Sequence, residues 1–323
     1  LNTLQDWGLK LVQKGFQFCH ITPPVNSADQ TFDCLLRWTP IYLTGNVKVY
    51  YYPRIRDQVH RHTLVLAPGE ISMTSNSIAG RVSGYATMLT TDQRLLQTYE
   101  TIFQDYLSLC RPMMNIYTLP EKVKQCFTRF LTSMGMRIQK LTALSAETTP
   151  PELVTYCIEK TKNEDLKKLG ELFINEMTLI EKERDKYELI DIVNLATAEE
   201  IRAGTVPIIL SCGTDLEPLY YTPETYVLHL RNILRIMKSC DNYHFIPQRG
   251  LSNQEGGLMV KEGQQALMLR MNKPFAVFEI SQPDIVLICR EHLLRIADRS
   301  GYLGIHRAKI MSRIKELIRE LQA

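Results

Sequence analysis

Apolar residues recur at every third or fourth position in eight long segments of the chain, the spacing of one face of an α-helix. Asp92 and Thr222 stand at the start of two of these segments, where their side chains can cap a helix N-terminus. After Asp92 the stripe expected to face a core comprises Leu95, Leu96, Tyr99, Ile102, Phe103, Tyr106, Leu107 and Cys110. The predicted helices are 3–14, 93–111, 121–141, 150–162, 164–193, 222–240, 282–300 and 305–323.

Short runs rich in β-branched and aromatic residues lie between these segments and are bounded by turn residues. Strands and helices alternate along most of the chain, but the pattern is helical throughout 119–205. The sequence therefore predicts an α/β fold with mixed β-sheets and a helical insert. The predicted strands are 16–21, 41–52, 64–66, 71–73, 84–91, 208–211, 242–247, 257–260, 266–269 and 275–281.

Two parts of the chain repeat the same succession of strand, hairpin, strand and helix. LVLAPGEISM at 64–73 parallels LMVKEGQQALML at 258–269, and 85–93 parallels 275–283. We therefore expect a first α/β half, a helical insert and a second half with a C-terminal helix, which divide the chain at 1–118, 119–205 and 206–323. Two similar halves that face each other form a cleft at their junction, and clefts are where ligands bind.

The stretch HRHTLVLAPGEISMTSN, residues 60–76, carries two histidines spaced by one residue and, after a P-G turn, a Ser-Asn pair. Its spacing resembles the active-site motif of the phospholipase D superfamily, H-x-K-x-x-x-x-D followed by G-S-x-N. The resemblance implies two pseudo-repeated halves and places His60 at the nucleophile position. His62 stands where the family has lysine, and Ala67 stands where it has aspartate.

In the second half the histidine, lysine and aspartate positions hold Gln254, Gly256 and Lys261. Phosphoryl transfer by two histidines needs one as nucleophile and one as general acid. Since the second half lacks its histidine, the resemblance implies a scaffold without this catalytic mechanism.

Residues 84–114, together with 198–205, 230–246 and 259–263, look similar to the sensor regions of bacterial helix-turn-helix transcription regulators with phospholipase D-like effector domains. The similarity implies a cytoplasmic homodimer that binds a small-molecule effector and is not an enzyme. DNA contact would come only through a segment outside this chain, and the start at Leu1 favours a longer polypeptide. No cofactor is expected.

Ligand contacts are predicted from both halves. Tyrosine and arginine side chains can form the rim of a pocket for an anionic ligand, the two histidines can form its wall, and the repeat assigns a glutamine and an arginine to the opposite side. The candidate ligand-binding residues are Tyr52, Arg54, His60, His62, Ser75, Asn76, Gln248 and Arg249.

Two other functions remain open. One is a diverged phosphodiesterase that uses His60 and His62, and the other is a protein-interaction scaffold with no ligand. A metal site is not expected, because the H-x-H pair has no further ligands at suitable spacing.

The composition excludes several classes of protein. With 38 basic and 35 acidic residues the formal charge is +3, which is too balanced to predict nucleic-acid binding by this chain alone. None of the eight cysteines forms a C-x-x-C pair, so buried free thiols are expected. No apolar run is long enough for a membrane span.

Overall fold

The computed structural model describes residues 2–22, 38, 41–42, 44, 46–53, 60–78, 86–162, 164–211, 218–248, 257–270, 275–299 and 307–323. The chain divides into two compact units. Unit 1 comprises 1–26 and 40–113, and unit 2 comprises 27–39 and 114–323. Both units contain helices and sheets, so the predicted α/β class is confirmed.

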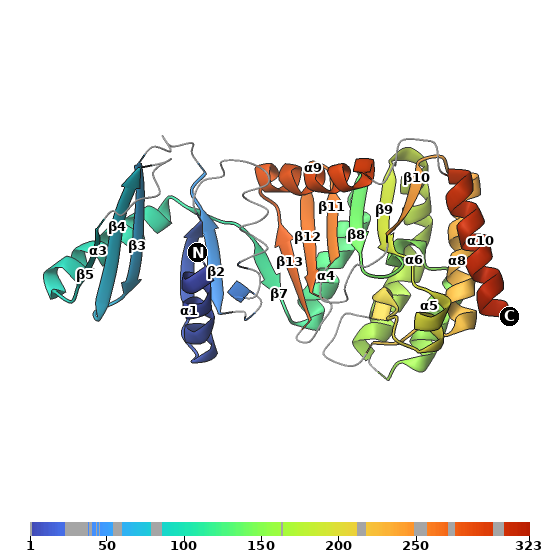
Figure 1. Cartoon of the computed structure of the whole chain (residues 1–323), viewed down its shortest axis with the longest axis horizontal. Coiled ribbons are helices and arrows are strands. Elements are labelled where there is room, and N and C mark those ends of the chain that lie inside the picture. Colours follow the sequence, from blue (N-terminus) through green and yellow to red (C-terminus); the bar gives the residue numbers. More distant parts are fainter. Residues whose placement is uncertain are drawn as a thin grey trace. The chain divides into compact units, whose positions relative to one another are not determined.

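Unit 1 contains two three-stranded sheets (Figure 1). In the first, β1 and β2 pair in parallel and β6 pairs antiparallel with β2. The second is an antiparallel meander of order β3-β4-β5, followed by α3. The elements are α1 (Asn2–Gln13), β1 (Phe18–Thr22), β2 (Val47–Tyr51), β3 (His60–Ala67), β4 (Ile71–Ile78), β5 (Thr87–Thr90), α3 (Gln93–Ser108) and β6 (Arg111–Pro112).

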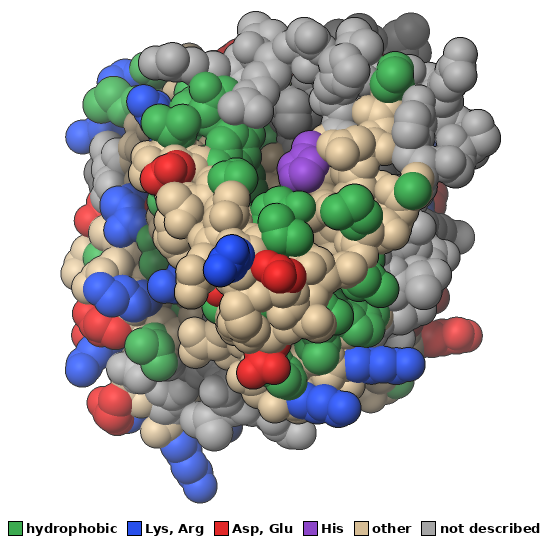
Figure 2. All heavy atoms as spheres, turned by 90° about the vertical axis from the view of Figure 1, so that its left-hand side faces the viewer, with side chains coloured by type: hydrophobic (Ala, Val, Ile, Leu, Met, Phe, Trp, Pro, Cys, Tyr) green, Lys and Arg blue, Asp and Glu red, His purple; other side chains and the backbone are tan. Residues whose placement is uncertain are grey.

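Helix α3 begins as the sequence predicts, because the Asp92 carboxylate accepts hydrogen bonds from the backbone N–H groups of Arg94 and Leu95. Its apolar stripe is only partly buried, however: Leu96 is inaccessible, whereas Leu95 and Ile102 are exposed. Apolar side chains are also visible on the surface at this end of unit 1 (Figure 2). The prediction of a continuous core-facing stripe is therefore wrong for Leu95 and Ile102, because a three-stranded sheet covers only part of a helix.

Unit 2 is built on one seven-stranded sheet of order β10-β9-β8-β11-β12-β13-β7 (Figure 1). Strands β8, β9 and β10 are parallel, and the other neighbours are antiparallel. Its strands are β7 (Asn115–Tyr117), β8 (Arg137–Leu141), β9 (Leu189–Asn194), β10 (Tyr243–Gln248), β11 (Gly257–Lys261), β12 (Gln265–Arg270) and β13 (Ala276–Ile280). Its helices are α4 (Pro120–Thr132), η1 (Ala146–Thr148), α5 (Pro151–Lys160), α6 (Glu164–Lys186), α7 (Ala198–Arg202), η2 (Ile209–Ser211), α8 (Pro223–Ser239), α9 (Pro283–Arg299) and α10 (Arg307–Gln322).

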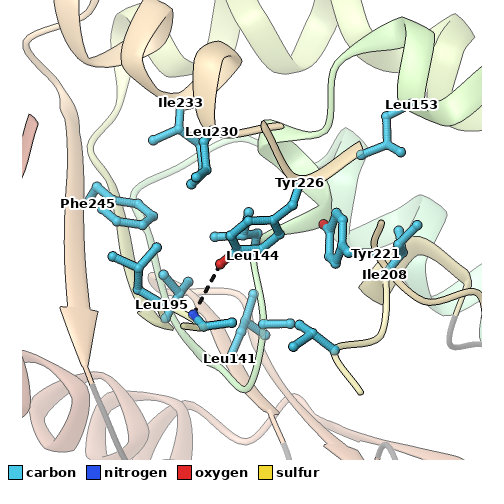
Figure 3. Close-up of a cluster of buried hydrophobic side chains, with 14 of the residues drawn as sticks. Leu141, Leu144, Leu153, Leu195, Ile208, Tyr221, Tyr226, Leu230, Ile233 and Phe245 are labelled. Atoms are coloured by element: carbon cyan, nitrogen blue, oxygen red, sulfur yellow. Dashed lines mark hydrogen bonds between the residues drawn. The ribbon is translucent and has the colours of Figure 1, made fainter. Parts of the chain in front are cut away.

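The two faces of this sheet differ in chemistry. Helix α9 lies across one face (Figure 1), where the buried strand residues, such as Ile138, Ile190 and Val260, are apolar. The other face contacts the large core to which α4, α5, α6, α8 and α10 contribute, and Figure 3 shows its part around Tyr226. Residues Ile314, Leu317, Ile318 and Leu321 of α10 are buried in this core, so the C-terminal helix packs against its own unit.

Several predicted elements need correction. The segments 121–141 and 164–193 are not helical throughout, because each helix is followed by a strand, β8 or β9, of the central sheet. Residues 208–211 form no strand, since 209–211 is a 3₁₀ turn. Among the described residues of 41–52, β2 is the one strand, and 41–42 is helical. Short apolar runs do not distinguish a buried strand from a helix end, which explains the first error.

The two units share part of their order of elements, and the repeat of two similar halves stays a prediction. Both units contain a parallel strand pair, β1-β2 or β9-β10, followed by an antiparallel meander and a helix. Whether the halves are phospholipase D-like, and whether a cleft lies between them, stays a prediction.

Candidate functional site

The hairpin of β3 and β4 brings two of the predicted site residues together in unit 1. His62 and Asn76 are opposite each other in the strand register, and His62 Nδ1 lies 2.9 Å from Asn76 Oδ1. An amide oxygen only accepts, so the proton of this hydrogen bond is on Nδ1 and Nε2 remains as the second ring nitrogen. Both side chains are exposed, which makes this pair a surface feature that a ligand can reach.

The neighbouring residues Ser75 and Asn76 lie on opposite faces of the hairpin. His60 begins β3 with Ile78 as its register partner, and its side chain lies outside the described residues. Ser75 is adjacent to Asn76 in β4 and points to the opposite face, where its partner is Thr63. Ser75 and Asn76 therefore cannot both contact a ligand that lies on one face of the hairpin.

Tyr52 packs within unit 1. Its ring stacks on that of Tyr106 in α3, with centroids 5.4 Å apart and an angle of 25° between the planes. This contact ties the end of β2 to α3 and leaves Tyr52 half-buried. Arg54, the other predicted rim residue of unit 1, lies outside the described residues.

Gln248 occupies the carboxyl end of β10 in unit 2. Its register partner is Asn194 at the end of β9, and the Leu195 N–H donates to the Gln248 carbonyl at 3.3 Å. Thr142 directly follows Leu141, the last residue of β8. Leu141 is the register partner of Val193, which precedes Asn194 in β9. Three adjacent parallel strands thus end in polar residues, and in open α/β sheets ligands bind outside these carboxyl ends. Arg249 lies outside the described residues.

This carboxyl edge comprises Thr142, Asn194 and Gln248. The core of unit 2 holds the loop that follows β9 at this edge. The Tyr226 hydroxyl accepts a hydrogen bond of 3.1 Å from the Ala196 N–H, just after β9 (Figure 3). Tyr226 is fully buried among Leu144, Leu195 and Leu230. Burial also raises the pKa of the Tyr226 phenol, so it stays neutral. The loop that follows β9 is therefore held by the core of unit 2.

A buried polar cluster, missed from the sequence, lies toward the amino ends of the same parallel strands. The inaccessible carboxylate of Asp191 accepts hydrogen bonds from Gln139 Nε2 at 2.5 Å and from the Tyr243 hydroxyl at 2.9 Å. Arg137 forms a buried ion pair with Glu147 of η1. Burial is the main reason that the pKa of Asp191 is raised to about 7, and the hydrogen bonds from Gln139 and Tyr243 oppose it.

The position of this cluster indicates a structural role. Its side chains are shielded from solvent, and it connects the sheet to η1 and to α6, where Arg184 donates to the Glu147 carbonyl at 2.8 Å. Ligands approach the carboxyl ends of parallel strands, whereas these groups lie away from them. Arg137, Gln139 and Asp191 alternate with apolar residues, a pattern typical of a strand. The pattern was missed because each of the two strands directly follows a long stretch with helical periodicity.

Lys261, which the resemblance places at the second aspartate position, is also structural. Its ammonium donates to the carbonyls of Phe130 and Ser133 at the end of α4, and its side chain is fully buried. A cation at a helix C-terminus satisfies terminal carbonyls and complements the helix dipole. The residue therefore caps a helix from the end of β11.

Some classes of site find no support in the described part of the chain. Within it, no three His, Cys, Asp or Glu side chains gather in a way that would hold a metal ion. None of its helices has the length and apolar character needed to cross a membrane.

No family model matches the chain, and neither a curated protein nor a solved structure shows significant similarity to it.

Proposed function

We propose that the chain is the non-catalytic, effector-binding portion of a bacterial transcription regulator, related in plan to the phospholipase D fold. The observation that carries this proposal is the role of Lys261. Where an active half would hold an aspartate, this residue caps α4 and is enclosed by the core. A position committed to helix capping is not available for phosphoryl transfer.

The polar groups that remain accessible suit binding. In unit 1 the His62–Asn76 pair is exposed and offers an imidazole nitrogen and an amide. In unit 2 the carboxyl edge presents the half-buried side chain of Asn194, beside a loop that a hydrogen bond from the Ala196 N–H to Tyr226 holds. In this proposal the effector engages one of these surfaces and shifts the geometry of a homodimer, and with it the spacing of DNA-binding segments outside this chain.

Thermal unfolding in the presence of single metabolites tests the proposal. The panel comprises nucleotides, sugar phosphates and amino acids, and an effector at about 100 times its Kd adds about 2.7 kcal/mol to stability. Two matched substitutions locate its site: Asn194→Ala removes an amide from the carboxyl edge, and Asn76→Ala removes one from the hairpin. We expect one of them to abolish the ligand-induced shift.

Two results would speak against an effector site at these surfaces. One is a panel in which no compound raises the unfolding temperature. The other is a ligand-induced shift that both variants retain in full, which would place the binding elsewhere.

A further inference from the structure

Helix α8 carries a row of cations on the side that faces away from the core. Arg231, Arg235 and Lys238 follow one another at spacings of four and three residues, so they share one face of the helix. All three are exposed, whereas the neighbouring positions Leu230, Ile233 and Met237 are buried. The row therefore lies on the outer side of α8, where Glu224 and Ser239 are exposed as well.

A shallow groove of about 430 Å³, wide open to solvent, lies over this stripe. It is lined by the three cations together with Leu234 and Ser239. Leu234 is only 8% exposed and forms an apolar floor, and the Ser239 hydroxyl lies at one end. Helix α10 packs along α8 (Figure 1), and α6 approaches it through an ion pair of 3.3 Å between Glu181 and Arg235.

The groove has three cations, and ion pairs neutralise fewer than three of them. Glu181 is the only carboxylate that an ion pair places against the three described cations. Lys238 lies in the last turn of α8, where the helix dipole favours a cation, but Arg231 lies two turns earlier, beyond the reach of that effect. Arg231 and Lys238 thus form no ion pair with a carboxylate among the described residues.

We propose that this groove on α8 binds a small amphiphilic anion, a phosphate or carboxylate group on an apolar body. The guanidinium groups hold the anionic oxygens, since arginine matches phosphate and carboxylate with two parallel N–H donors. The apolar body lies over Leu234. The span from Arg231 to Lys238 is about 10 Å at the helical rise. This site is separate from the hairpin and the carboxyl edge.

Calorimetric titration with octyl phosphate tests the proposal, with inorganic phosphate and octyl glucoside as partial probes. We expect octyl phosphate to bind at least tenfold more tightly than phosphate alone, and octyl glucoside to show no binding. Raising NaCl from about 0.05 M to about 0.5 M should weaken the binding severalfold, because exposed charges are screened.

Charge reversal then locates the site. The double variant Arg231→Glu/Lys238→Glu leaves the Arg235–Glu181 ion pair intact and should weaken octyl phosphate binding at least tenfold. The matched control is Lys160→Glu/Lys162→Glu, which makes the same charge change at exposed positions of unit 2 and should bind as the unchanged chain does. Circular dichroism confirms that both variants are folded.

Three results would overturn the proposal. The first is no binding of octyl phosphate at millimolar concentration. The second is equal binding by both double variants. The third is binding to phosphatidylglycerol vesicles or to polyglutamate without binding of octyl phosphate, which would assign the groove to a lipid surface or an acidic chain.

Discussion

The meander of unit 1 and the meander of unit 2 have the same order of elements, but the first is largely exposed and the second is largely buried. In unit 1, three of the four residues of β5 are exposed and α3 has one buried residue, Leu96. In unit 2, every residue of β11 and β13 is buried. The difference follows from neighbours: β11-β12-β13 continues into other strands on both sides and is covered by helices, whereas β3-β4-β5 is a sheet of three strands.

The comparison shows which strands of the two meanders can keep polar side chains. A strand that is enclosed on both faces can keep a polar side chain only if the fold itself satisfies it, as it does for Lys261. A strand with an open face, such as β3, can keep exposed groups such as His62. We therefore expect corresponding substitutions in the two meanders to have very different effects.

The largest contrast should come from the last residues of β3 and β11. Lys261→Asp places a carboxylate against the carbonyls of Phe130 and Ser133, with an expected cost of roughly 3–5 kcal/mol to unit 2. Ala67→Asp, the same new side chain at the exposed end of β3, should change stability by less than about 0.5 kcal/mol. Hydrogen exchange measured by mass spectrometry follows the peptides of each unit separately. Equal costs at both positions would contradict the difference in burial.

Leu96→Ala should be the next most harmful change. Because Leu96 is the one inaccessible residue of α3, its truncation leaves a cavity and costs roughly 2–5 kcal/mol. Ile102→Ala on the same helix, at an exposed position, is the control and should cost less than about 1 kcal/mol. Faster exchange in α3 and the β3–β4 hairpin, with unit 2 unchanged, is the expected pattern. Similar exchange in both variants would show that α3 is held by other contacts.

A smaller, pH-dependent effect should distinguish unit 2. The raised pKa of Asp191, about 7 against the ordinary 3.8, means that its protonated form is favoured by folding. This contribution is present below about pH 4 and is lost as the pH rises to about 7, by up to about 1.4 kcal/mol per pH unit. The nearby Glu147 and Arg184 charges act on the same group in opposite directions.

Asp191→Asn removes that contribution, so the stability of the variant relative to the unchanged chain should rise between about pH 4 and about pH 7. Burial lowers the pKa of His229 to about 3, which makes stability fall at acid pH in both proteins and cancels in the difference. Urea unfolding at several pH values provides the measurement. Parallel pH profiles would show that Asp191 does not titrate in this window.

The smallest effect on stability should come from the hairpin. His62→Ala removes one exposed cross-strand hydrogen bond, which is worth less than about 1 kcal/mol. Thermal unfolding without ligand should therefore hardly change, which separates a binding role of His62 from a structural one. A drop of several degrees would assign His62 to the fold of unit 1.

The sequence predicts individual helices and strands better than it predicts the contacts that these elements make. The Asp92 and Thr222 caps, both meanders and their following helices were predictable, because capping residues and apolar periodicity act within a few residues. Strands β8 and β9 were not, since each short strand follows directly on a long amphipathic helix. The cluster at Asp191 and the capping by Lys261 depend on contacts between distant segments, and spacing along the chain does not encode these contacts. For the predicted site, the alternation of side chains along a strand was enough to place His62 and Asn76 on one face of the hairpin. The same alternation places Ser75 on the opposite face.

The central claim is that the hairpin surface does not catalyse phosphodiester hydrolysis. Hydrolysis of bis(4-nitrophenyl) phosphate tests it most directly, comparing the unchanged chain with His60→Ala and His62→Ala and with buffer. Our account predicts that the unchanged chain releases nitrophenolate no faster than either variant. Hydrolysis above the buffer rate that disappears in His60→Ala would contradict it and would identify the chain as a phosphodiesterase.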